Sequence, residues 1–143
     1  MSEVLITGGN GFLGKGLAKK LMKNHKVILG SRNNALNKIA SEETGCESTP
    51  LDVTNFQSIK DALCRYKPNI VIHAAATKFV DLSEKFPLEC TDINVQGSMN
   101  LARACIDSDV ETVIGISTDK TAPPIGNIYG LSKAIMERVF ISL

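Results

Sequence analysis

Short apolar runs alternate along this chain with longer stretches in which apolar residues recur every three or four positions. The short runs are rich in β-branched residues, and they predict strands at residues 3–7, 27–29, 47–51, 69–76 and 112–116. The longer stretches predict helices at residues 12–22, 36–43, 55–67, 88–107 and 129–141, and residues 78–86 are expected to form a loop.

This alternation of strands and helices is typical of an α/β fold with a doubly wound parallel sheet. The segment NIVIHAAA at residues 69–76 is almost entirely apolar, as expected of a strand covered on both faces. We therefore expect residues 1–143 to form one Rossmann domain with strand order 3-2-1-4-5 and helices on both faces. Such sheets bind ligands at the carboxyl ends of their strands, where the candidate polar groups should gather.

The first predicted strand runs directly into a glycine-rich turn and an amphipathic helix. Glycines at positions 8, 11 and 14 would make the tight turn, let the backbone approach a pyrophosphate and allow close packing of helix on strand. Free N–H groups at the start of the helix would then face the phosphates. An ordinary tight turn is the alternative, but the placement favours a nucleotide site with contacts from Gly8, Asn10, Gly11, Phe12, Leu13 and Gly14.

The end of the second strand indicates which dinucleotide binds. No carboxylate occupies the position at which an NAD site holds the ribose 2′-hydroxyl, and Ser31, Arg32 and Asn33 stand there instead. A hydroxyl and a fixed cation suit a 2′-phosphate, so NADP is favoured over NAD; an arginine on a polar turn is the alternative. After the third strand, Asp52 beside Val53 could contact the adenine or cap the next helix.

Small residues close the fourth strand and leave room for a cofactor. His73 precedes them and is interpreted as a hydrogen-bonded core histidine, and Lys78 follows them. Asn94 interrupts the apolar face of the long helix, either as a buried group that bridges helix to strand through water or as an exposed one. The cofactor contacts predicted here are Ala74, Ala75, Ala76, Lys78 and Asn94.

The segment STDKTAPPIGNIYGLSK, at residues 117–133, carries the candidate catalytic groups. Tyr129 and Lys133 are four residues apart, about one helical turn, so they share a face of the last helix. An ammonium so placed stabilises the phenolate that a general base requires. Thr118, Asp119 and Lys120 follow the fifth strand, and the last two are adjacent titratable groups. The alternative is an ordinary amphipathic helix preceded by a capping turn.

Composition excludes several other function classes. The 143 residues carry 16 basic and 15 acidic side chains, scattered along the chain, so neither nucleic acid nor an anionic membrane is indicated as a partner. The four cysteines include no CxxC pair and are expected to be reduced thiols. No run of 18 apolar residues occurs, and we expect a cytoplasmic protein.

These motifs resemble those of the extended short-chain dehydrogenase/reductase superfamily. TGGNGFLG is similar to its TGxxGxxG cofactor loop, and YGLSK is similar to its YxxxK pair. A closer resemblance is to UDP-N-acetylglucosamine 4,6-dehydratases of the CapD-like polysaccharide biosynthesis family. The blocks HAAATKFVDLSEKFPLEC, INVQGSMN and STDK follow one another in that family's order.

The resemblance implies a role for each candidate residue. Tyr129 would take the proton of the sugar 4-hydroxyl, Lys133 would stabilise the phenolate and hold a ribose hydroxyl, and Thr118 would bind the 4-oxygen. Asp119 and Lys120 would perform the elimination of water, after which the hydride returns to C6 and NADP is regenerated. The substrate would be a UDP-sugar, and pairing through the helices at 88–107 and 129–141 would give a dimer or larger ring.

The chain departs from the family pattern in two respects, and two other functions are compatible with its motifs. The segment between Lys120 and Tyr129 is about one residue longer than in the family, and relatives continue for roughly as many residues again. The C-terminal region that binds the substrate in those relatives is absent from these residues.

A 4-epimerase or a 4-keto-sugar reductase uses the same tyrosine and lysine without the Asp119 and Lys120 pair. A catalytically inactive NADP-binding module is the other alternative.

Overall fold

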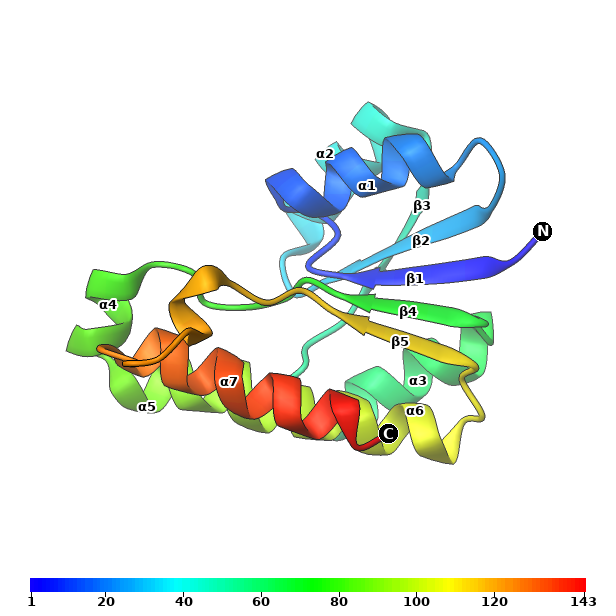
Figure 1. Cartoon of the computed structure of the whole chain (residues 1–143). Coiled ribbons are helices and arrows are strands. Elements are labelled where there is room, and N and C mark those ends of the chain that lie inside the picture. The colour runs from blue at the N-terminus through cyan, green and yellow to red at the C-terminus, as the bar shows by residue number, and fades with distance from the viewer.

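A five-stranded parallel sheet with helices on both faces forms the centre of the computed structural model, which describes residues 1–143 (Figure 1). The strand order is β3-β2-β1-β4-β5, and this confirms the predicted fold class and topology. In register, Thr7 lies beside Gly30 on one side and His73 on the other. The strands are β1 (Glu3–Thr7), β2 (Lys26–Ser31), β3 (Glu47–Pro50), β4 (Ile70–His73) and β5 (Thr112–Gly115).

The helices divide between the two faces of the sheet. In Figure 1, α1 and α2 lie above the sheet, whereas α3, α6 and α7 lie below it, and α4 extends beyond the carboxyl ends of the strands. The α-helices are α1 (Phe12–Leu21), α2 (Asn34–Thr44), α3 (Phe56–Tyr66), α4 (Val80–Lys85), α5 (Pro87–Thr91), α6 (Gly97–Asp107) and α7 (Ile128–Ile141). A π-helical turn (Asp92–Gln96) joins α5 to α6, and a 3₁₀ turn (Asp119–Thr121) follows β5.

Alternate strand residues enter two separate cores, one on each face. Leu5 and Val71 join side chains of α3 and α6, whereas Ile6 and Leu29 join Ala18 of α1 and other residues on the opposite face. Both sides of β1, β2 and β4 are therefore apolar, which explains why these three strands appear in the sequence as continuous hydrophobic runs.

Asparagine is the N-cap residue of three helices. The side chains of Asn33, Asn55 and Asn127 accept backbone N–H groups at the starts of α2, α3 and α7, as capping residues do. Asp52 does not cap α3; its Oδ1 instead accepts from the N–H and hydroxyl of Thr54.

The prediction of a loop at residues 78–86 is wrong, because Val80–Lys85 form α4. Six residues are too few for helical periodicity to stand out in the sequence. Tertiary contacts stabilise this helix: Ser83 is buried, and Glu84 accepts a hydrogen bond from Ile128 N at the start of α7. The fourth strand is also shorter than predicted and ends at His73.

The long helix predicted at 88–107 is helical throughout but changes its winding at the π-helical turn. The spacing of apolar residues in this helix predicts five inner residues, and all of them are buried: Cys90, Ile93, Leu101, Ala104 and Cys105.

The spacing of apolar residues in α7 predicts an inner face with Ala134, Ile135, Val139 and Phe140. This prediction is wrong for Ile135, which is 45% exposed, while Met136 and Lys133 face inward. Apolar residues lie on several sides of this helix, so its periodicity alone does not define the buried side. None of the helices combines the length and the apolar character needed to cross a membrane.

Candidate functional site

A cavity of about 390 Å³ opens at the carboxyl ends of the strands, where the chain order reverses between β1 and β4. This is the position at which doubly wound sheets bind ligands. Its lining includes residues that follow each of the first four strands. Among them are the predicted cofactor contacts Gly8, Asn10, Gly11, Ser31, Arg32, Asn33, Asp52, Val53, Ala74, Ala75, Ala76 and Lys78.

The glycine turn has a shape that larger residues would block. Gly8 adopts φ +68°, and a Cβ there would lie 2.8 Å from Ala75 N; a Cβ on Gly14 would lie 2.6 Å from Gly8 O. At Gly8, both the backbone conformation and the close approach are ones that only glycine tolerates. At the start of α1, Gly11 is the N-cap and offers no side-chain acceptor, so the first N–H groups stay free for a ligand. The side chains of Phe12 and Leu13 are exposed, and neither residue lines the cavity.

Asn37 of α2 braces the same turn and was missed by the sequence analysis. Its Oδ1 accepts from Asn10 Nδ2 at 3.2 Å, and its Nδ2 donates to Ser31 O at 2.8 Å. The side chain is buried, and a polar residue on the inner side of an amphipathic helix was the available signal.

Ser31 lines the cavity, and its hydroxyl also makes two hydrogen bonds within the protein. It belongs to β2 rather than to the following turn; its hydroxyl donates to Gly30 O at 2.7 Å and accepts from Asn10 N at 3.2 Å. The hydroxyl proton is thus engaged within the protein. Arg32 lies exposed at the cavity and takes part in none of the four salt bridges of the chain.

Lys133 points an ammonium group into the interior without a strong acceptor. The residue is 4% exposed, and Nζ reaches only the thioether Sδ of Met136, at 3.5 Å. Burial lowers the pKa of Lys133 to about 8, although Glu137 acts in the opposite direction. A buried cation whose only partner is a weak acceptor favours the binding of ligand oxygens.

Tyr129 begins the turn of α7 before Lys133 and is half-buried. Its backbone carbonyl accepts from Ser132 Oγ at 2.7 Å. Neither Tyr129 nor Lys133 lines the cavity beside the glycine turn.

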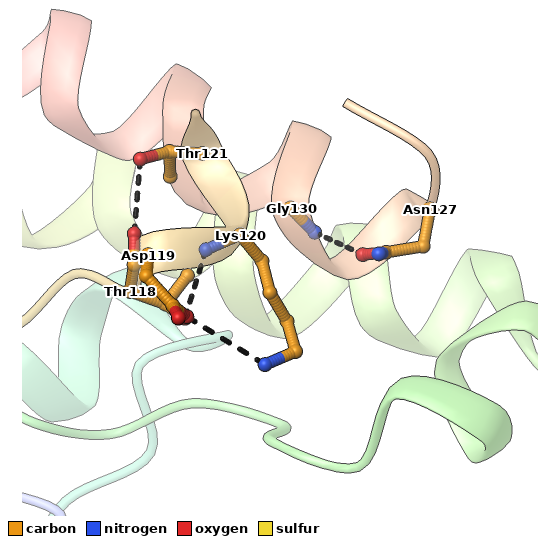
Figure 2. A network of polar contacts seen from close by, with 6 residues as sticks. All are labelled: Thr118, Asp119, Lys120, Thr121, Asn127 and Gly130. Atoms are coloured by element: carbon orange, nitrogen blue, oxygen red, sulfur yellow. Dashed lines mark hydrogen bonds and ion pairs between the residues drawn. The ribbon is translucent and has the colours of Figure 1, made fainter. Parts of the chain in front are cut away.

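Asp119 and Lys120 lie on the 3₁₀ turn after β5, and Thr118 is its N-cap (Figure 2). Lys120 Nζ is 3.6 Å from Asp119 Oδ1, and the Asp119 side chain is 93% exposed. Thr118 Oγ1 accepts from Lys120 N at 3.4 Å. The turn packs against the start of α7, where a Cβ on Gly130 would lie 2.4 Å from Lys120 O. The tertiary structure thus brings this turn beside the helix that carries Tyr129 and Lys133.

Asn94 is buried, so the exposed alternative is wrong. It bridges elements directly: Oδ1 accepts from Thr77 N at 2.9 Å, and Nδ2 donates to Thr77 O at 3.1 Å and to Ser132 Oγ at 3.0 Å. The residue does not line the cavity but holds the segment that follows β4 against α7.

Comparison with known proteins finds a matching family model and relatives that are named as nucleotide-sugar enzymes. The family model described as "Polysaccharide biosynthesis protein" matches residues 4–143. A UDP-N-acetylglucosamine 4,6-dehydratase (inverting) of Campylobacter jejuni is 33% identical over 149 residues, which cover 98% of this chain and 43% of the relative. A UDP-glucose 4-epimerase of Rickettsia typhi is 36% identical over 148 residues, which cover 97% of this chain and 42% of the relative.

Solved structures agree with this relationship. Pen from Bacillus thuringiensis has a TM-score of 0.89 at 30% identity and matches 99% of this chain and 46% of its own. The UDP-Glc/GlcNAc 4-epimerase from Campylobacter jejuni has a TM-score of 0.87 at 27% identity, with 97% and 48% matched. The Thermus thermophilus UDP-glucose 4-epimerase, solved as a complex with NAD, has a TM-score of 0.83 at 25% identity, with 98% and 50% matched.

The chain spans less than half the length of these curated relatives. The family match extends over nearly all of its residues, including the TGGNGFLG turn and the YGLSK pair. This chain belongs to the polysaccharide biosynthesis protein family, within the extended short-chain dehydrogenase/reductase superfamily.

Proposed function

We propose that this chain is the cofactor-binding and proton-transfer part of a nucleotide-sugar 4,6-dehydratase that uses NADP and a substrate of the UDP-N-acetylglucosamine type. The observation that carries the proposal is the acid and base pair of Asp119 and Lys120, 3.6 Å apart on a turn that packs against the helix of Tyr129 and Lys133. Hydride chemistry at C4 requires only the tyrosine and lysine, whereas loss of water from C5 and C6 also requires an acid and a base.

The residues present fit a dinucleotide. The glycine turn leaves free N–H groups and a space that Cβ atoms would fill, and Lys133 offers a buried ammonium without an oxygen partner. The glycine turn would hold the pyrophosphate, and Lys133 would hold a ribose hydroxyl. When bound, the nicotinamide supplies a reversible hydride acceptor for the sugar.

Arg32 is the residue that we propose for NADP preference. Its exposed guanidinium, which is free of salt bridges, would pair with a 2′-phosphate, while Ser31 supports the glycine turn from behind. NAD is the alternative cofactor, and the NAD complex of the Thermus epimerase supports it.

Proton transfers would be divided among the side chains around the 3₁₀ turn. Tyr129 takes the proton of the 4-hydroxyl while Thr118 binds the 4-oxygen. Lys120 takes the C5 proton and Asp119 protonates the departing 6-hydroxyl, which leaves as water. The hydride taken from C4 would then return to C6 and the proton on Lys120 to C5, which gives the 4-keto-6-deoxy sugar. Asp119 is 93% exposed, so its carboxyl group is accessible to a bound sugar.

The test is incubation of the protein, expressed from its complete coding region, with NADP and UDP-N-acetylglucosamine. We expect a 4-keto-6-deoxy product whose mass is lower by one water, and loss of that product in Asp119→Asn. Absence of product from a protein that binds NADP would contradict the proposal.

A 4-epimerase is the second candidate, and the Rickettsia epimerase at 36% identity supports it. An epimerase would yield an isomer of unchanged mass, and Asp119→Asn would leave its rate nearly unaltered. An inactive module would bind the dinucleotide and yield neither product.

We also expect the protein to form a dimer or larger ring. An exposed apolar groove runs along α7 and includes Ile125, Leu131 and Ile135. Sedimentation equilibrium measures the mass of the assembly, and a monomer at micromolar concentration would contradict this expectation.

A further inference from the structure

A continuous set of hydrogen bonds runs through the interior from the cofactor cavity to the π-helical turn, and His73 lies at its centre. His73 is the last residue of β4 and is 1% exposed. Its Nδ1 is 2.7 Å from the hydroxyl of Thr7, the last residue of β1, and its Nε2 is 3.1 Å from Ser98 Oγ. At the two ends, Thr7 Oγ1 accepts from Ala75 N at 3.2 Å and Ser98 Oγ donates to Asn94 O at 2.5 Å.

The direction of these bonds determines the tautomer of His73. A hydroxyl has one proton, and the proton of Ser98 is donated to Asn94 O, so Ser98 must accept from His73 Nε2–H. Nδ1 is then unprotonated and accepts the proton of Thr7. The oxygen of Thr7 remains available to accept from Ala75 N–H, and every polar hydrogen in the set has an acceptor.

A charged or Nδ1-protonated imidazole would disturb this arrangement. The oxygen of Thr7 would then accept from both Nδ1–H and Ala75 N–H, and its own proton would lose its acceptor inside the protein. Burial lowers the pKa of His73 to about 3, and the positive charge of Lys133 acts in the same direction. The ring of Phe140 covers the imidazole, with 5.5 Å between ring centroids. His73 therefore stays neutral at physiological pH.

We propose that neutral His73 is a positioning residue for the cofactor cavity: by accepting the proton of Thr7 it orients the hydroxyl that holds Ala75, and so fixes the wall opposite Gly8. A small displacement of Ala75 would change the space beside Gly8, because a Cβ on Gly8 would already lie 2.8 Å from Ala75 N and 2.9 Å from Ala74 O. The inference rests on the proposed binding of a dinucleotide in this cavity, which Ala74 and Ala75 line.

Three substitutions separate the two bonds of the imidazole. In His73→Asn, Oδ1 takes the place of Nδ1 and still accepts from Thr7, whereas the bond to Ser98 is lost. In His73→Gln, the amide reaches towards Ser98 but not Thr7. His73→Phe fills the same volume without either bond.

The affinity for NADP, measured by calorimetry on folded protein, should decrease about tenfold in His73→Gln and His73→Phe, and by less than about threefold in His73→Asn. Hydrogen exchange at the amide of Ala75 should accelerate about tenfold in the same two variants and stay near the wild-type rate in His73→Asn. A loss that is equal in all three variants, or absent from His73→Phe, would overturn the proposal.

The tautomer is measured without any cofactor. In a long-range ¹H–¹⁵N spectrum of the wild type at neutral pH, we expect a protonated Nε2 and an unprotonated Nδ1. The opposite assignment refutes the role of His73 even when the cofactor binds. If the wild type does not bind NADP or NAD, the proposed function fails, and the exchange rate of Ala75 still decides whether His73 positions this wall.

Discussion

Replacement of Lys133 by methionine should stabilise the free protein while weakening cofactor binding. The ammonium of Lys133 is buried against Met136 Sδ, and its pKa falls from 10.5 to about 8. A lowered pKa in the folded state means that the stability present above pH 10.5 is lost as the pH falls through 8, so the full penalty applies at pH 7. A difference of about 2.5 pKa units corresponds to about 3 kcal/mol, which sets an upper limit on the penalty.

Methionine has a similar unbranched length and no charge, so Lys133→Met should raise the free energy of unfolding by about 1 to 3 kcal/mol at pH 7. Urea unfolding of the cofactor-free protein measures this change. Wild-type stability should also rise by about 2 kcal/mol between pH 7 and pH 9.5, and the variant should lack that part of the rise. Lys20→Met, at an exposed position of α1, is the matched control and should change stability by less than about 0.5 kcal/mol.

Cofactor affinity should change in the opposite direction. Loss of a charge-assisted hydrogen bond to a ribose hydroxyl should weaken NADP binding by about 10- to 100-fold in Lys133→Met. A variant that is less stable than the wild type at pH 7, or the same dependence of stability on pH in both proteins, would contradict the burial penalty assigned to Lys133. A variant that is more stable than the wild type but binds NADP normally would show that burial of Lys133 is costly and that Lys133 does not hold the cofactor.

Gly14→Ala should destabilise the fold by about 1 to 3 kcal/mol and impair dinucleotide binding, because its Cβ would lie 2.6 Å from Gly8 O. Gly16→Ala, in the same helix with no atom within 4 Å of the new Cβ, should be neutral or stabilise by up to about 1 kcal/mol; equal effects in thermal unfolding would contradict this account. NADP should bind at least about tenfold tighter than NAD, and Arg32→Ala should remove the preference; calorimetry that finds equal affinities in the wild type counts against the assignment. The pKa of His73 is lowered from 6.5 to about 3, so the free energy of unfolding of the wild type should decrease by about 2 kcal/mol between pH 6.5 and pH 5, and that of His73→Gln should decrease by less. If urea unfolding gives the same dependence on pH for both proteins, the histidine is not held neutral.

Much of the cavity could be predicted because its residues follow strands, and the carboxyl ends of parallel strands meet at one edge. Gly8, Gly11, Arg32 and the alanines after β4 were found in this way, and the structure places them around one cavity. Asn37 and Ser98 were not found, because a polar residue on the inner side of a helix does not show which residue of another element it contacts. The engaged hydroxyl of Ser31 was missed for the same reason.

The sequence alone determined the order of strands and helices, the glycine turn and the pairing of Tyr129 with Lys133 on one helix. These features depend on local periodicity, backbone geometry and spacing within one turn, all of which are encoded in neighbouring residues. Only the tertiary structure decided that α4 is a helix, which side of α7 is buried, and that Lys133 lacks an oxygen partner. It also decided the tautomer of His73, because β1, β4 and the helix that carries Ser98 each supply one part of the hydrogen-bonded set. Those features depend on partners that are distant in the sequence, and the contacts that stabilise them form only when the elements pack together.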